Sequence, residues 1–100
     1  MYRGTTPTLN FTFEHNLEEL SLEALYITFK QGTEVVLEKS LEELEIKENK
    51  VTINLTQQET LKFASYKPIL IQARIKANGG AYATNIVTTD LKAILKDGEI

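Results

Sequence analysis

Apolar and polar residues alternate with a period of two in several short stretches, and this alternation constrains the fold more than any other feature of the chain. Leu9, Phe11 and Phe13 are apolar, and the residues between them are polar. This pattern is typical of a strand with one buried face. Similar stretches follow at residues 25–29, 35–37, 44–46, 51–55, 69–76 and 81–88. Short strands at this spacing, without long helices between them, predict an all-β fold, an antiparallel sandwich of about seven strands.

The apolar positions of these strands define the expected core. Its members are Phe11, Phe13, Leu25, Ile27, Phe29, Val35, Leu37, Val51, Ile53, Leu55, Ile69 and Ile71. Turns are expected at Gly32-Thr33 and Asn49-Lys50, with a tight hairpin at Asn78-Gly79-Gly80. Glycine and asparagine suit these places because they readily adopt the positive backbone angles that tight turns require.

Three loops carry a helix-start pattern, in which a short polar residue precedes a glutamate by three positions. The pairs are Asn16 with Glu19, Ser40 with Glu43, and Thr56 with Glu59. In a capping box of this kind, the polar side chain accepts from a backbone amide and the glutamate reaches back. We expect short helical turns in the loops that bridge the two sheets, with Leu61 packed at the sandwich edge after the third turn.

Two stretches fit more than one structure. Residues 17–23 fit a helical stripe, and we favour a strand only from Ala24, because Tyr26 to Phe29 form a β-branched and aromatic cluster. Residues 90–97 resemble a capped two-turn helix, but local propensity does not distinguish helix from strand there.

A chain of 100 residues forms one domain. We expect residues 1–7 to form a polar N-terminal arm, frayed or reaching a neighbouring copy, and residues 8–100 to form a single β-sandwich domain. No apolar run approaches the roughly 20 residues that cross a bilayer, and the first residues lack the apolar centre of a signal peptide. The expected location is therefore the cytoplasm, without membrane insertion.

Charge is distributed unevenly along the chain. The formal net charge is −3, but residues 14–48 hold ten carboxylates and three lysines, whereas residues 49–100 hold seven basic and four acidic side chains. Nucleic-acid binding usually requires a basic patch in a positive overall field. The mildly acidic field therefore argues against a nucleic-acid partner.

Few residues suit catalysis or metal binding. The chain has no cysteine and a single histidine, His15, which removes thiol nucleophiles and sulfur-ligated metals. Adjacent carboxylates such as Glu18-Glu19 and Glu42-Glu43 do not converge on one point as paired catalytic acids must. Neither a calcium loop nor a phosphate-binding glycine motif is present. The sequence therefore predicts a protein that is not an enzyme and has no cofactor or metal.

Four segments together resemble small uncharacterised proteins of tailed bacteriophages and prophages, and the immunoglobulin-like N-terminal domains of phage baseplate proteins. The segments are MYRGTTPTLNFTF at residues 1–13, the hairpin of residues 26–39, VTINLTQQETL at 51–61, and the ending at 91–100. The resemblance implies an immunoglobulin-like sandwich that serves as a structural or adaptor part of a virion tail or baseplate. Its partners would be other virion proteins and copies of itself, first in the cytoplasm and then in the virion.

Two segments are the candidate interaction surfaces, because free sheet edges and exposed charges favour contacts between subunits. The candidate residues are Arg3, Thr5, Thr6 and Pro7 of the arm, and Glu42, Glu43, Glu45 and Glu48 of an acidic loop. Basic groups of a neighbouring subunit would meet these glutamates. The alternative function is a monomeric binding module that holds a peptide or carbohydrate with the loops at one end of the sandwich.

Overall fold

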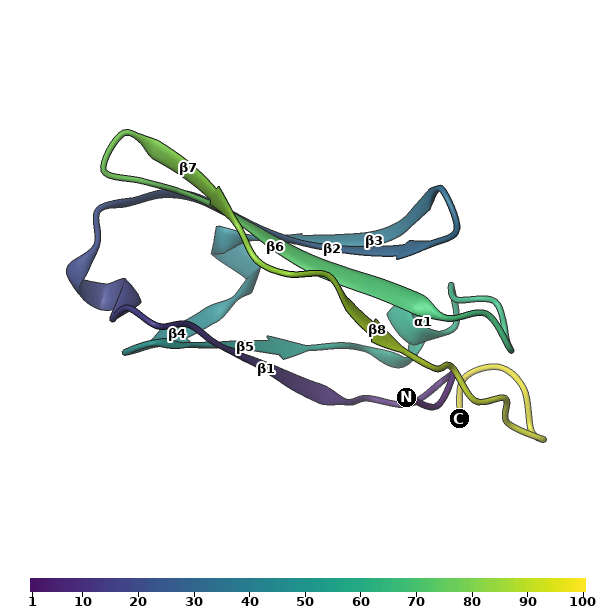
Figure 1. Ribbon diagram of the computed structural model, residues 1–100. Coiled ribbons are helices and arrows are strands. Elements are labelled where there is room, and N and C mark those ends of the chain that lie inside the picture. Colours follow the sequence, from purple (N-terminus) through teal and green to yellow (C-terminus); the bar gives the residue numbers. More distant parts are fainter.

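Two antiparallel sheets face each other in the computed structural model, which describes residues 1–100 (Figure 1). The smaller sheet has the order β1 (Thr8–Thr12), β5 (Lys50–Asn54) and β4 (Glu45–Lys47). The larger sheet has the order β3 (Glu34–Ser40), β2 (Leu22–Gln31), β6 (Ile69–Ala77) and β7 (Gly80–Ala83), and β8 (Val87–Thr89) also pairs with β6. The prediction of an all-β antiparallel sandwich is confirmed.

The strand order is that of an immunoglobulin-like sandwich without its first strand. In chain order, β1 to β7 occupy the positions called B, C, C′, D, E, F and G in that fold. Strand A, which there pairs with B, has no counterpart beside β1. As a result β1 ends the smaller sheet, with β5 as its only partner.

The last predicted strand is divided in two, which gives eight strands instead of about seven. Ala83 pairs with Arg74, but Val87 pairs with Ile71, so the register shifts by one residue between β7 and β8. Thr84 fills the break, since its hydroxyl accepts from the Ala73 amide at 3.1 Å and its own amide donates to the Ala73 carbonyl at 3.0 Å.

All three expected helical turns are present, and each links a strand of one sheet to a strand of the other. They are η1 (Leu17–Glu19), η2 (Leu41–Glu43) and α1 (Gln57–Thr60). Only α1 has the complete capping box, in which the Glu59 amide donates to Thr56 Oγ1 at 3.2 Å and the Thr56 amide donates to Glu59 Oε1 at 2.9 Å. Asn16 caps η1, whereas the Ser40 side chain makes no capping hydrogen bond to the backbone.

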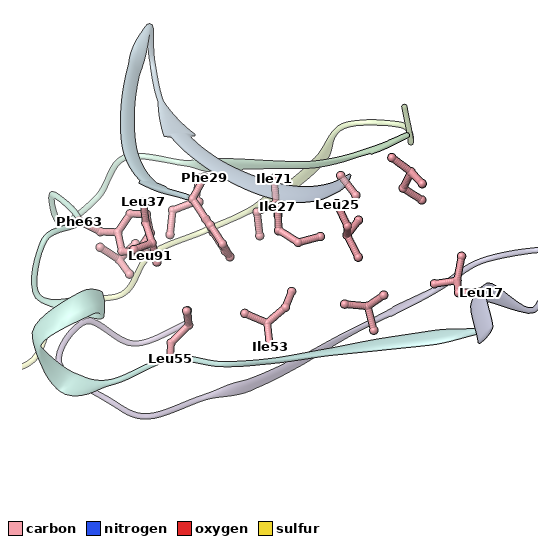
Figure 2. Packing of buried hydrophobic residues seen from close by; sticks show 14 of the residues in the cluster. Leu17, Leu25, Ile27, Phe29, Leu37, Ile53, Leu55, Phe63, Ile71 and Leu91 are labelled. Carbon is pink, nitrogen blue, oxygen red and sulfur yellow. The ribbon is translucent and has the colours of Figure 1, made fainter. Parts of the chain in front are cut away.

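Most of the expected core is buried between the sheets, as Figure 2 shows for Ile53 of the smaller sheet, Leu55 directly after β5, and Ile27 and Phe29 of the larger sheet. The confirmed residues are Leu25, Ile27, Phe29, Leu37, Val51, Ile53, Leu55, Ile69 and Ile71. Phe11 and Phe13 are only partly buried. Phe63, rather than Leu61, is the buried residue after α1, and its ring meets that of Phe29 edge-on at 6.0 Å.

Val35 was expected in the core but is half exposed, and the reason is a bulge in β3. Phe29 pairs with Leu37 whereas Lys30 pairs with Val35, which leaves Val36 without a partner. Directly opposed residues share one face of a sheet, so Val35 lies with exposed Lys30 on the outer face. The same register places Lys39 opposite buried Ile27, on the inner face.

Two of the three turns form where expected. Asn78 and Gly79 both have positive φ, of 51° and 79°, as a two-residue hairpin turn requires, and Gly32 has a φ of 63°. The turn expected at Asn49-Lys50 is misplaced by one residue. Lys47 pairs with Lys50, so Glu48 and Asn49 form the turn and Glu48 adopts the positive φ, of 56°.

The two stretches that fitted more than one structure have different outcomes. Residues 17–19 form η1, and the following strand begins at Leu22, two residues before the favoured start. Residues 90–97 form no helix: Leu91 is buried in the core, and Lys92 forms an isolated parallel bridge with Tyr2. Burial of Leu91 and pairing with the N-terminal segment hold the first residues of this stretch in a non-helical conformation.

An ion pair joins β3 of the larger sheet to α1, which follows the smaller sheet. Lys39 Nζ lies 2.5 Å from Glu59 Oε2 and 3.6 Å from Glu43 Oε2. The Lys39 and Glu59 side chains are only 11% and 17% exposed. Burial raises the pKa of the Glu59 carboxyl, but hydrogen bonds from Lys39 and Thr56, with the Lys39 charge, outweigh it, so the pKa lies below its ordinary 4.5.

We expect Lys39→Met and Glu59→Gln each to lower the free energy of unfolding at pH 7 by about 1–3 kcal/mol, because each leaves a largely buried charge without its partner. The double variant should lose less than the sum of the two. Lys76→Met is the control, since Lys76 and Glu23 form an exposed pair worth about 0.5 kcal/mol. Urea unfolding measures all four; additive losses would contradict a coupled pair.

The same pair predicts a pH dependence. The folded state holds the Glu59 pKa below its ordinary value, so the stability from this group is present above pH 4.5 and is lost as the pH falls through the folded-state pKa. The difference in unfolding free energy between the wild type and Glu59→Gln should therefore shrink below pH 4.5. Urea unfolding at several pH values tests this, and a constant difference down to pH 3 would refute it.

Candidate interaction site

The N-terminal segment lies against its own domain. The Arg3 amide donates to the Lys92 carbonyl at 3.0 Å, and the Lys92 amide donates to the Met1 carbonyl at 2.8 Å. Further along, the Thr5 carbonyl accepts from the Thr60 hydroxyl at 2.8 Å, and the Pro7 carbonyl accepts from the Leu55 amide at 3.1 Å. Residues 1–7 are therefore neither frayed nor extended from the domain in this structure.

Arg3 anchors this segment through all of its guanidinium nitrogens. Nε donates to the Phe63 carbonyl and Nη2 to the Leu61 carbonyl, both at 3.0 Å, and Nη1 pairs with the Asp97 carboxylate. The charge of Arg3 is thus satisfied within the chain. Of the other arm candidates, Thr5 and Thr6 are exposed and Pro7 is partly buried.

The acidic candidates lie at the other end of the sandwich. Figure 1 shows β4 at one end and both termini at the opposite end, so the structure does not bring the arm and the acidic loop together. Glu42, Glu43, Glu45 and Glu48 are all exposed. Glu43 contributes to the Lys39 cluster, and the other three make no ion pair within the chain.

Sequence reasoning missed a third surface, along the flank where β1 faces β7 and β8. We call this surface the open flank: Leu9 and Phe11 of β1 and Phe13 directly after it, with Tyr82, Ile86 and Val87 of the opposite edge. Leu9, Phe11 and Phe13 are only partly buried. Tyr82, Ile86 and Val87 are 61%, 58% and 48% exposed. Their apolar character was visible in the sequence, but their position beside a free edge was not.

Two grooves run along the open flank. One, of about 690 Å³, lies between the end of β1 and Tyr82, and the other, of about 530 Å³, lies between Leu9, Phe11 and Val87. Glu14 and His15 are the only acidic or basic side chains that line these grooves. The grooves can therefore receive apolar groups, with hydroxyl and amide groups at their margins.

Apart from these two grooves, a hollow of about 330 Å³ lies on the outer face of the larger sheet around Tyr26 and Arg74. Its other charged groups already have partners, since Lys76 pairs with Glu23 at 3.5 Å and Glu38 accepts from the Thr28 hydroxyl at 2.9 Å. Arg74 makes no ion pair within the chain, and the hollow is smaller than either groove of the open flank, so it offers less surface to a partner.

No group of three or more metal-ligating side chains comes together in the structure. None of the helical segments combines the length and apolar character that crossing a bilayer requires. Comparison of the chain with protein-family models, curated proteins and solved structures found no match.

We expect Arg3→Ala to loosen the N-terminal segment, because the Leu61 and Phe63 carbonyls and Asp97 lose their shared donor. The free energy of unfolding should fall by about 1–2 kcal/mol. Hydrogen exchange of the Lys92 amide, which donates to Met1, should accelerate. Lys96→Ala is the exposed control, and unchanged Lys92 exchange in Arg3→Ala would show that strand pairing alone holds the segment.

Proposed function

We propose that this protein is a non-enzymatic structural or adaptor domain that acts through protein–protein contacts in the tail or baseplate region of a phage or prophage virion. It is made in the cytoplasm and incorporated during assembly. The phage assignment rests on the resemblance of four sequence segments, and the mode of action rests on the open flank.

The observation that carries the proposal is the concentration of apolar surface on one flank of a chain in which 25% of residues are charged. Exposed apolar patches on soluble proteins commonly mark contacts with other proteins. Here Tyr82 lies across one groove from Phe13, and Val87 lies across the other from Leu9 and Phe11. Ile86, between Tyr82 and Val87 in the chain, is 58% exposed. A partner that covers this flank would complete the burial of an existing core cluster.

The alternative, a monomeric module that holds a peptide or carbohydrate with its end loops, has one observation in its favour. A hollow of about 470 Å³ lies at the end near the termini, between Arg3, Lys62, Ser65 and Asp97. Its surface is polar, but the Arg3 guanidinium is already committed to three partners. The open flank is therefore the stronger candidate for a contact surface.

We expect Val87→Asp to prevent incorporation into virions, because a carboxylate on the open flank would be buried unpaired against the partner. Thr88→Asp is the matched control: it adds the same charge at the next residue of β8, which pairs with Leu70 and points to the other face. Mass spectrometry of gradient-purified particles, with each variant supplied in place of the wild type, gives the readout.

Particles that lack the wild-type protein would overturn the virion assignment. If both variants are incorporated as well as the wild type, the open flank is not the contact surface. Circular dichroism and melting curves should match between the two variants, since both positions are exposed.

A further inference from the structure

The four sheet edges differ in how well they are protected against pairing with another strand. Natural proteins protect edges with charges, bulges, proline or short length. β4 has only three residues, two of them charged, and β3 carries exposed Glu34 and Glu38, a bulge and inward-pointing Lys39. The β7–β8 edge is broken by the register shift at residues 84–86.

β1 has none of these protections. Its five residues, Thr8–Thr12, include no charge and no proline, and they pair with β5 in one unbroken register. β1 is also where an immunoglobulin-like sandwich would add its first strand. The edge is therefore open to a further strand.

The hydrogen bonds of β1 show which backbone groups face outward. The Phe13 amide donates to Asn49, and the Pro7 carbonyl accepts from Leu55, so odd-numbered residues face the smaller sheet. Because the facing side alternates along an antiparallel strand, the N–H and C=O groups of Thr8, Asn10 and Thr12 point to the free edge. These three residues provide the hydrogen-bonding positions for an incoming strand.

The sequence of β1 is symmetric in polarity about Asn10. An antiparallel copy centred there places Thr8 opposite Thr12, Asn10 opposite Asn10, and Leu9 opposite Phe11. The polar pairs coincide with the outward-facing backbone positions, and the apolar pairs lie on the inner face beside the grooves. The register is self-complementary and brings no like charges together.

From this match we propose that the partner at the open flank is a second copy of this chain, joined by antiparallel pairing of β1 with β1 about a two-fold axis at Asn10. The two smaller sheets become one continuous sheet. The grooves beside Leu9 and Phe11 of the two copies then lie next to each other, and Val87 of each copy lines its own groove. This inference shares its surface with the proposed function but holds for the isolated protein.

Charge substitution at Asn10 tests the axis, because each copy meets its own residue there. Sedimentation from about 10 µM to about 1 mM should show a wild-type dimer. Asn10→Lys and Asn10→Asp should each raise the dimer dissociation constant at least about fivefold, since like charges would stand directly opposite. An equimolar mixture of the two variants should recover the wild-type constant through opposite charges.

Cysteine cross-linking tests the same register independently, since the chain has no cysteine of its own. Asn10→Cys should form a disulfide-linked dimer on mild oxidation, because opposed hydrogen-bonded residues have Cα atoms about 5.5 Å apart. Asn54→Cys is the control: Asn54 is exposed on β5, about three strand spacings from its copy. It should remain monomeric under the same conditions.

A wild-type monomer throughout the concentration range would overturn the proposal. A dimer unaffected by either charge variant, or cross-linked equally by both cysteines, would place the contact elsewhere and overturn it as well. Loss of dimerisation in Asn10→Lys counts only if its melting curve shows an intact fold. The absence of the protein from virions would overturn the proposed function and leave the dimer measurement unaffected.

Discussion

The packing of the two sheets against each other depends on which side chains fill the space between their edges. These side chains differ between the two flanks of the sandwich. On the β3 side, the largely buried Lys39–Glu59 pair spans the gap from the larger sheet to α1. A charge in this position would be costly without its partner, so the pair fixes β3 and α1 relative to each other. On the β1 side no ion pair crosses between the sheets, and the side chains there are mostly apolar. The difference between the flanks makes one closed and the other a candidate for contact.

The period-two alternation was sufficient to predict the fold class and most of the core, because burial of one strand face leaves a direct trace in the sequence. It failed at Val35, because the bulge at Val36 exchanges the inner and outer faces of β3 before Leu37. No residue type in this stretch of the sequence predicts the bulge. The inward Lys39 is likewise explained only by the folded structure, since its partner Glu59 lies twenty positions later in the chain.

The candidate site was harder to predict than the fold, for a physical reason. Charge and polarity drew attention to Arg3 and the acidic loop, but Arg3 is satisfied by Leu61, Phe63 and Asp97, which come near it only after folding. Conversely, Phe11 was expected to be buried because the sequence does not reveal which strand ends a sheet. Whether an inward-facing residue is covered depends on strand order, a property of the whole chain.

Strand order therefore bears directly on the proposed contact surface. A sandwich with its first strand in place would cover β1, and its exposed edges would be those that charges and bulges already protect. In this chain the N-terminal segment instead pairs with Lys92, at the far end of the opposite sheet edge. Because the N-terminal segment does not pair with β1, the N–H and C=O groups of Thr8, Asn10 and Thr12 are left without a backbone partner, beside an apolar groove. The proposed pairing of β1 with a second copy would satisfy these backbone groups and cover the groove at the same time.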